Sequence, residues 1–470
     1  MFFDSPAYIV FLTIVVAAYW RLPRTGQNIF LLCASYFFYG WWDWRFLLLM
    51  IASTCIDYVI GRQLPLVTDT TRRRSLLVLS LVINFSILGF FKYFNFFTAS
   101  FANLLTTIGV HGVPMSVLRI ILPPGISFYT FQEVAYIVDV YKGKIKPAQS
   151  FVDYALFISL FPHLIAGPIQ QPGHLLPQVQ RDRVPDSNRI FDGLLLILFG
   201  LFQKCIIADN CALIANAAFN GRFGQTTAPV VLLGTYAFAW QIYGDFAGYS
   251  NIARGSAQLL GFHFMINFRQ PYLATSLQDF WRRWHISLSS WLRDYLYIPL
   301  GGSRKGEGRT YGNLLTTMLL GGLWHGANWT FVVWGAIHGG GLALERVLGL
   351  KSENDGAQTW IGRWTKRVLL FNLICLTWVF FRATSLSAAV QFLSGLGRFS
   401  WQANYFTALR FLTIFAGAMF LIDLRMELAD EEYPFQKISP LMRVGVGAAA
   451  VLAIAMFGAN QTNAFIYFQF

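Results

Sequence analysis

The chain has 470 residues, of which 55% are hydrophobic and only 13% are charged, and its formal net charge is +13. Soluble domains carry about 25% charged residues, so this composition excludes an ordinary soluble protein and predicts a chain embedded in a lipid bilayer. The positive balance does not indicate a nucleic-acid partner. Basic residues collect in short loops between apolar runs, as expected of cytoplasmic loops in a membrane protein.

Apolar runs recur along nearly the whole sequence, beginning at 8–20, 28–41, 45–60 and 75–97. A helix needs about 20 apolar residues to cross a bilayer, and several runs meet that length while others are too short. We therefore expect an all-α polytopic membrane protein with roughly ten to twelve transmembrane helices and additional re-entrant or half-membrane helices. No polar stretch is long enough for a soluble domain, which predicts a single membrane domain over 1–470.

Charges in the first loops predict the topology. Arg21 and Arg24 follow the first apolar run, and three arginines at 72–74 follow the third. Loops two spans apart lie on the same side, so the positive-inside rule places both in the cytoplasm and the N-terminus on the other side. The first run is preceded by Asp4 and by no basic residue, which indicates a retained span and not a cleaved signal peptide.

Two segments rich in helix breakers follow, at 122–129 and 161–168. Their prolines and glycines would end or kink any helix. Such segments are typical of half-helix turns beside a cavity, and equally of ordinary loop ends.

Two later blocks, at 279–289 and 321–329, set His285 and His325 among Trp, Leu and Gly residues. A central Arg, Lys or Asp in a membrane helix costs roughly 2.5–3.5 kcal/mol, so ionisable residues in such surroundings are more often used than tolerated. The apolar piece at 311–323 is too short to cross a bilayer. We expect the chain to enter, turn near His325 and leave on the same side, with His325 in an internal chamber.

Together these blocks resemble the membrane-bound O-acyltransferase (MBOAT) family, most closely its bacterial branch containing the alginate O-acetylation membrane subunit. The teichoic-acid D-alanylation enzymes are more distant relatives. The motifs that carry the resemblance are SFYTFQ at 127–132, YIVDVYKG at 136–143, FPHLIAGPI at 161–169, DFAGYS at 245–250, FWRRWHISLSSWLRDYLYIPLGG at 280–302, LLGGLWHGANW at 319–329 and FIYFQF at 465–470. Two positions depart from the pattern: Asn251 stands where the family often has Asp, and Gly244 where it has an aromatic residue.

The resemblance implies an MBOAT fold around a central chamber, with a catalytic core at about 118–349. It implies an inner-membrane O-acyltransferase that moves acetyl from a cytoplasmic thioester, acetyl-coenzyme A or an acyl carrier, towards hydroxyls of an exported polysaccharide of the alginate, cellulose or peptidoglycan type. It also implies a periplasmic partner resembling SGNH hydrolases, and no bound cofactor. The rival hypothesis is a non-catalytic channel or transporter for acyl groups or polymer; the lack of an internal sequence repeat counts against it.

Residue roles follow from the same resemblance. The family's histidine at the position of His325 is essential, so His325 is the expected general base for the acceptor hydroxyl. His285 matches the second prominent histidine and either orients an acceptor, assists His325 or holds helices together. Arg282 and Arg283 either contact phosphates of the donor or flank a helix end.

Three further residues complete the candidate site. Asn328 either donates to the oxyanion, fixes the tautomer of His325 or caps a helix. Trp324 is a candidate substrate contact beside that histidine. Asp245 is also grouped with the substrate-binding candidates, although in its apolar setting it needs a partner, an Arg or a Tyr, and favours a role as a structural pin.

Other histidines and metals contribute less. His163 and His338 are expected to pack between helices. No metal site is expected, because no third ligand lies at a convincing spacing from His285 and His325.

Overall fold

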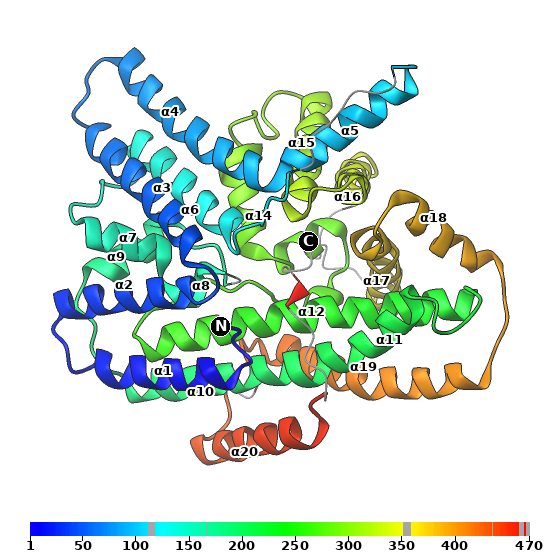
Figure 1. The fold of residues 1–470 in the computed structure, drawn as a ribbon. Coiled ribbons are helices and arrows are strands. Elements are labelled where there is room, and N and C mark those ends of the chain that lie inside the picture. The colour runs from blue at the N-terminus through cyan, green and yellow to red at the C-terminus, as the bar shows by residue number, and fades with distance from the viewer. Residues whose placement is uncertain (111–117, 166, 351–358, 435, 460–464, 467–470) are drawn as a thin grey trace. The chain divides into compact units, whose positions relative to one another are not determined.

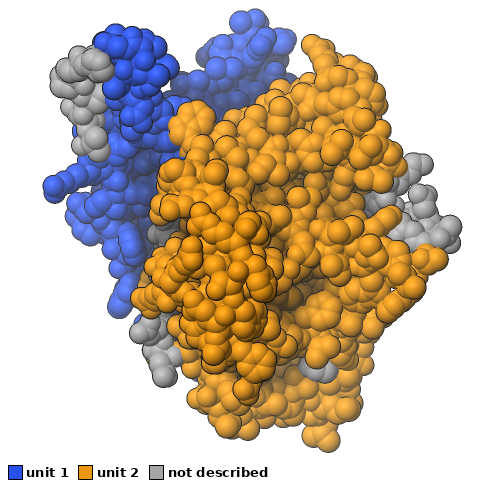
Figure 2. All heavy atoms as spheres, turned by 90° about the vertical axis from the view of Figure 1, so that its right-hand side faces the viewer, with its two compact units in different colours: residues 1, 7–185, 326–328 blue, residues 2–6, 186–325, 329–470 orange. Residues whose placement is uncertain are grey.

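The computed structural model describes residues 1–110, 118–165, 167–350, 359–434, 436–459 and 465–466. In these residues the regular structure is helical, without β-strands (Figure 1), which confirms the predicted all-α class. They form two compact units, one of residues 1, 7–185 and 326–328 and the other of residues 2–6, 186–325 and 329–470 (Figure 2). The core predicted at 118–349 draws on both units, and the single domain over 1–470 stays a prediction.

Buried polar bonds hold the helices of the first unit together. These helices are α1 (Pro6–Tyr19), α2 (Arg24–Gly40), α3 (Trp44–Gln63), α4 (Thr70–Leu88), the π-helix η1 (Gly89–Tyr93), α5 (Phe94–Thr107), α6 (Ile126–Tyr141), α7 (Phe151–Ser159), α8 (Phe161–Leu164) and α9 (Pro172–Gln180). Glu133 of α6 accepts from Ser53 and Thr54 of α3 at 3.0 and 3.1 Å. Asp57 of α3 accepts from Asn84 of α4 at 2.7 Å. Buried carboxylates need such donors.

The two breaker-rich segments contact each other. In the first segment Gly125 directly precedes α6, and the second segment contains the single turn α8. Gly125 has φ 74°, and a Cβ there would lie 2.4 Å from the Leu164 carbonyl oxygen, so only glycine fits. His163 of α8 is buried, with Nδ1 3.1 Å from the side-chain amide of Gln132 in α6. This histidine joins two helices, the packing role predicted for it.

The second unit contains the longer helices and both histidine blocks. Its elements are α10 (Ser187–Leu201), the π-helix η2 (Phe202–Ala208), α11 (Asp209–Phe219), α12 (Ala228–Leu259), the 3-10 turn η3 (Pro271–Leu273), α13 (Leu277–Arg283), α14 (Ile286–Leu292), the π-helix η4 (Arg293–Tyr297), α15 (Glu307–His325), α16 (Trp329–Val347), α17 (Trp360–Arg382), α18 (Leu386–Ser394), the 3-10 turn η5 (Gly395–Gly397), α19 (Ala403–Ala429) and α20 (Pro440–Phe457). Helices α10, α11 and α19 all pack against α12 and against the π-helix η2 (Figure 1).

Helices α10 and α12 approach backbone to backbone. A Cβ on Gly200 would lie 2.6 Å from the Gly248 carbonyl oxygen, and one on Gly248 would lie 2.7 Å from that of Gly200. Small residues permit such close contacts in membrane proteins. A Cβ on Gly244 would lie 2.9 Å from the Gln203 carbonyl oxygen, so an aromatic side chain would not fit beside η2. Asn251 donates to the Gln203 side chain at 2.7 Å.

Six stretches of helix are long and apolar enough to cross a bilayer. They are Trp44–Gln63, Thr70–Thr107, Ser187–Phe219, Trp360–Arg382, Ala403–Ala429 and Pro440–Phe457, and two shorter apolar helices cover Pro6–Tyr19 and Leu386–Gly397. The protein is therefore a multi-pass membrane protein. By length and composition the described helices give fewer spans than the ten to twelve expected, because apolar stretches such as 151–164 fold into shorter helices, here α7 and α8.

Helices α15 and α16 form an antiparallel hairpin whose first arm ends at His325. A Cβ on Gly322 would lie 2.2 Å from the Phe331 carbonyl oxygen, and one on Gly335 would lie 2.3 Å from that of Met318. The chain thus reverses direction where the sequence predicted a turn. Helix α15 is longer than the apolar piece at 311–323, because it already begins in the preceding polar segment; the depth of the turn in the bilayer stays a prediction.

Candidate active site

His285 and His325 come from separate sequence blocks and lie together in the second unit. His325 is the last residue of α15, and His285 directly precedes α14 in the left-handed backbone conformation, with φ 43°. Their ring centroids are 6.2 Å apart. Both are buried, with 0% of His285 and 3% of His325 exposed. The structure therefore brings together the two histidines predicted to be catalytic.

Aromatic rings enclose the histidine pair. The Trp324 ring lies 5.8 Å from His285 and 5.0 Å from His325, centroid to centroid. Trp334 of α16 and Phe381 of α17 lie 5.3 and 5.2 Å from His325. Such a wall keeps bulk water away, and electrostatic interactions are stronger where water is excluded. Trp324, predicted as a substrate contact, is buried beside both imidazoles.

Asn267, which the sequence analysis missed, determines where His285 carries its proton. Its Oδ1 accepts from the backbone N–H and the hydroxyl of Ser287 at 3.3 and 2.9 Å, and its Nδ2 donates to Ser250 at 3.1 Å. These hydrogen bonds with Ser287 and Ser250 establish which atom of the Asn267 amide is the oxygen. This oxygen lies 3.1 Å from His285 Nδ1, so Nδ1 is the protonated nitrogen and Nε2 carries the lone pair.

Substitution of Asn267 tests this orienting role. We expect Asn267→Ala to lower kcat for acyl transfer about 10- to 100-fold, the range found when groups that orient metal-bound histidines are removed. Asn267→Asp keeps the acceptor and should retain more activity, with a pH–rate profile displaced to higher pH because an anion stabilises the imidazolium. As a control, Asn372→Ala removes a hydrogen bond outside the site, the one that the Tyr236 hydroxyl donates to Asn372 at 2.6 Å. Equal rates for Asn267→Ala and Asn372→Ala would contradict the assignment.

Arg282 and Arg283 occupy different environments. Arg283 donates from Nε to Asp279 and from Nη1 to Glu427, both at 2.8 Å. Burial would lower its pKa, but the hydrogen bonds to Glu427 and Asp279 outweigh burial and the net shift is upward. Arg282 is exposed, and among the residues that the structure describes it forms no ion pair. Arg283 is therefore committed to internal bonds, and Arg282 is the arginine that can meet a ligand.

A polar cavity of about 310 Å³ lies beside these arginines. Arg282 and Arg283 line it together with Arg269, Gln270, Asp279, Met426, Glu427 and Asp430. Arg269 forms an ion pair with Asp430 at its edge. Three arginines and three carboxylates line this cavity, so its formal charges balance, and Arg282 is the arginine in it whose guanidinium is not held by one of these carboxylates.

Asp245 has a buried partner, but the partner is a lysine. Lys204 Nζ lies 2.9 Å from Asp245 Oδ1 and 2.9 Å from Asp209 Oδ1, with all three side chains at most 4% exposed. The second oxygen of Asp245 accepts from the backbone N–H of Ile466 at 2.7 Å. The expected Arg or Tyr partner was wrong. Both oxygens of Asp245 hold protein groups, so these contacts tie α12, η2 and the C-terminal segment together and give a substrate no open carboxylate oxygen.

Asn328 directly precedes α16, and His338 lies in the middle of that helix. The backbone N–H of Asn328 donates to Gly326 at 3.0 Å. The Thr377 hydroxyl donates to the Ile374 carbonyl at 2.8 Å and so accepts from His338 Nε2 at 3.1 Å. His338 thereby joins α16 to α17, as predicted. Among the described side chains, no group of three His, Cys, Asp or Glu residues could hold a metal ion.

The protein is thus a helical membrane protein with a buried pair of histidines walled by aromatic rings. The profile of the MBOAT, membrane-bound O-acyltransferase family matches residues 144–385. The chain is 44% identical to the probable alginate O-acetylase AlgI of Azotobacter vinelandii, over 83% of this chain and 76% of that protein. It is 36% identical to the peptidoglycan O-acetyltransferase of Helicobacter pylori, over 84% and 80%.

A more distant match is the teichoic acid D-alanyltransferase of Streptococcus thermophilus, at 29% identity over 47% of this chain and 56% of that protein. The chain belongs to the membrane-bound O-acyltransferase family, and it is an O-acyltransferase. The resemblance seen in its motifs is thereby confirmed.

Proposed function

We propose that this O-acyltransferase takes an acetyl group from a cytoplasmic thioester and passes it towards the hydroxyls of an exported polysaccharide. The names of its relatives support acetyl as the group and an alginate- or peptidoglycan-type polymer as the acceptor. The observation that carries the proposal is the enclosed pair of His325 and His285 in the second unit. A channel for polymer or acyl groups would need no general base such as His325. It would also need no second histidine, His285, with a fixed tautomer.

The reaction needs one proton acceptor. His325 takes the proton of the acceptor hydroxyl while its oxygen attacks the thioester carbonyl. A tetrahedral oxyanion forms, the carbon–sulfur bond breaks, and the thiolate leaves and receives the proton from His325. His285, with its lone pair on Nε2, assists by orienting the acceptor, whose single hydroxyl hydrogen goes to His325. Acetyl-coenzyme A and an acyl carrier fit this scheme equally, and neither is a resident cofactor.

The donor phosphates are assigned to Arg282. A hydrogen bond to a charged group contributes about 1.5–3 kcal/mol, so we expect Arg282→Ala to raise KM for the thioester about 10- to 100-fold with an unchanged melting temperature. Arg283→Ala removes an arginine bonded to two carboxylates. It should lower the melting temperature and have little effect on KM. Kinetics and thermal unfolding of the two purified variants check both statements. The reverse pattern would assign the donor to Arg283.

The proposal also includes the membrane location, the topology and a partner protein. Arginines at 21, 24 and 72–74 favour a cytoplasmic position for the first and third loops, and hence an inner-membrane protein with a periplasmic N-terminus. The acceptor would then lie on the side opposite the donor. A periplasmic partner of the SGNH-hydrolase type would receive the acetyl group or place it on the polymer.

The test uses the full chain in detergent with acetyl-labelled coenzyme A or acetylated carrier, with and without the candidate periplasmic partner and polysaccharide. Label is expected to leave the thioester and to appear as a hydroxylamine-labile ester on polymer or partner. A folded protein that transfers no label under any of these conditions, yet passes acetyl groups across a vesicle membrane, would overturn the enzymatic proposal in favour of a conduit.

A further inference from the structure

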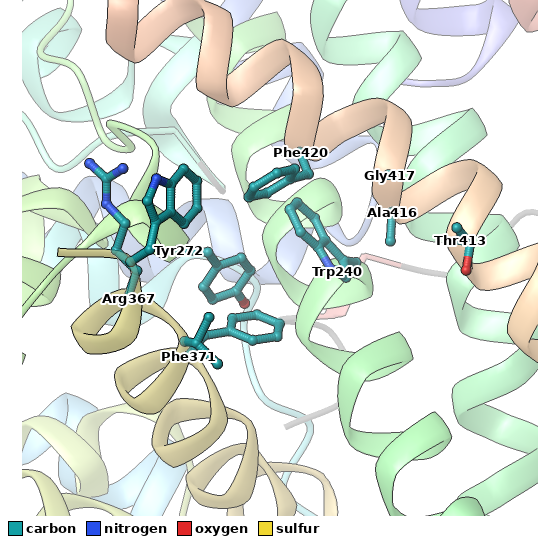
Figure 3. A pocket seen from close by; sticks show the side chains of 10 residues that line it. Trp240, Tyr272, Arg367, Phe371, Thr413, Ala416, Gly417 and Phe420 are labelled. Atoms are coloured by element: carbon teal, nitrogen blue, oxygen red, sulfur yellow. The ribbon is translucent and has the colours of Figure 1, made fainter. Parts of the chain in front are cut away.

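A second cavity, of about 290 Å³, lies in the second unit and is apolar (Figure 3). Trp240 of α12, Tyr272 of η3, Phe371 of α17 and Phe420 of α19 form its walls, and Gly417 of α19 contributes only backbone to its lining. The Tyr272 hydroxyl donates to the Ala239 carbonyl at 2.7 Å. The tyrosine therefore contributes an apolar ring face to a cavity that contains little to attract water.

The helices that frame this cavity face lipid. Both α17 and α19 are long and apolar enough to cross a bilayer. Large apolar side chains on both helices are more than half exposed: Val368 and Leu369 on α17, and Ile414 and Leu421 on α19. An apolar cavity of about 150 Å³ already stays dry and binds a benzene-sized ligand. A larger cavity on this surface suits a segment of hydrocarbon chain.

Basic residues of α17 lie at one end of the cavity. Arg367 lines it, with Nε donating to the Leu273 carbonyl at 2.9 Å and Nη2 3.8 Å from Glu427, which balances its charge. Arg363 lies one turn earlier on α17, and Lys366 directly precedes Arg367; both are exposed, and neither forms an ion pair among the residues that the structure describes. Basic residues at the end of a spanning helix mark its cytoplasmic end and attract anionic headgroups.

We propose that this cavity binds one anionic phospholipid of the cytoplasmic leaflet. An acyl chain lies between α17 and α19 against Trp240, Phe371 and Phe420, and the phosphate lies near Arg363 and Lys366. Neither His285 nor His325 lines this cavity, and we assign it no part in acyl transfer. Its ligand is a membrane lipid, and the lipid holds the two spanning helices together.

Native mass spectrometry of the full-length protein tests the proposal, with dioleoyl-phosphatidylglycerol and dioleoyl-phosphatidylcholine as probes. The unmodified protein should retain one phosphatidylglycerol and prefer it over phosphatidylcholine about tenfold. A Cβ on Gly417 meets no atom within 4 Å, so Gly417→Leu fills the cavity without a backbone clash and should lose the lipid. Gly445→Leu on α20, which also meets no atom within 4 Å, is the matched control and should keep it.

The headgroup is tested separately. Arg363→Gln combined with Lys366→Gln should retain a bound lipid but abolish the preference for phosphatidylglycerol. Equal lipid retention by Gly417→Leu and Gly445→Leu would overturn the site, and equal retention of both lipids by the unmodified protein would overturn the anionic headgroup. A dimer that disappears only in Gly417→Leu would assign the cavity to a second copy of the chain.

Discussion

His325→Ala is expected to reduce acetyl transfer by roughly 10²–10⁴-fold, the usual contribution of a general base. Only 3% of the His325 side chain is exposed, and its ring lies against Trp324, Trp334 and Phe381. Alanine leaves those rings in place and removes the only group at the end of α15 that can take a proton. The measurement is the rate of label transfer from acetyl thioester to acceptor, with the melting temperature recorded in the same preparation.

A second buried histidine provides the control. His338→Gln keeps a donor for Thr377 and lies on the same hairpin, so it tests whether any substitution in these packed rings would inactivate the enzyme. We expect His338→Gln to retain most of the activity. If the rate falls equally in both variants while both remain folded, packing and not proton transfer would explain the loss at His325.

The sequence predicted well what depends on composition and local pattern. Apolar composition was enough for the helical membrane class, and the glycine-rich block around His325 predicted a reversal of the chain that the α15–α16 hairpin confirms. The family motifs singled out His285 and His325 as catalytic candidates and left the role of His285 open. No helical period or spacing would have predicted a 6.2 Å separation of their rings.

Other features depend on contacts between distant residues. Asn267 lies in an irregular segment, 18 residues before the histidine that it orients, and an isolated Asn in a loop carries no signal of its own. The lysine partner of Asp245 was missed for a related reason. Lys204 lies in the π-helix η2, and a local change of helical winding redirects a side chain without a recognisable sequence pattern.

Lys204→Met is expected to destabilise the protein by about 3–5 kcal/mol, the cost of removing one partner from a buried ion pair. The lysine bridges Asp209 and Asp245, and its loss leaves two buried carboxylates without their cation. Asp245 also holds the backbone of Ile466, so the C-terminal segment should loosen together with η2. Thermal unfolding in detergent and limited proteolysis of the C-terminal segment measure the two effects.

Neutralising the carboxylates separates charge from packing. If uncompensated charge causes the loss, adding Asp209→Asn and Asp245→Asn to Lys204→Met should restore much of the melting temperature, because the amides need no cation. Lys142→Met, at an exposed position after α6, is the matched control and should behave like the unmodified protein. If Lys204→Met alone is as stable as Lys142→Met, the ion pairs of Lys204 with Asp209 and Asp245 do not hold η2 against α12. Asp245 would then again be a candidate for contact with the substrate.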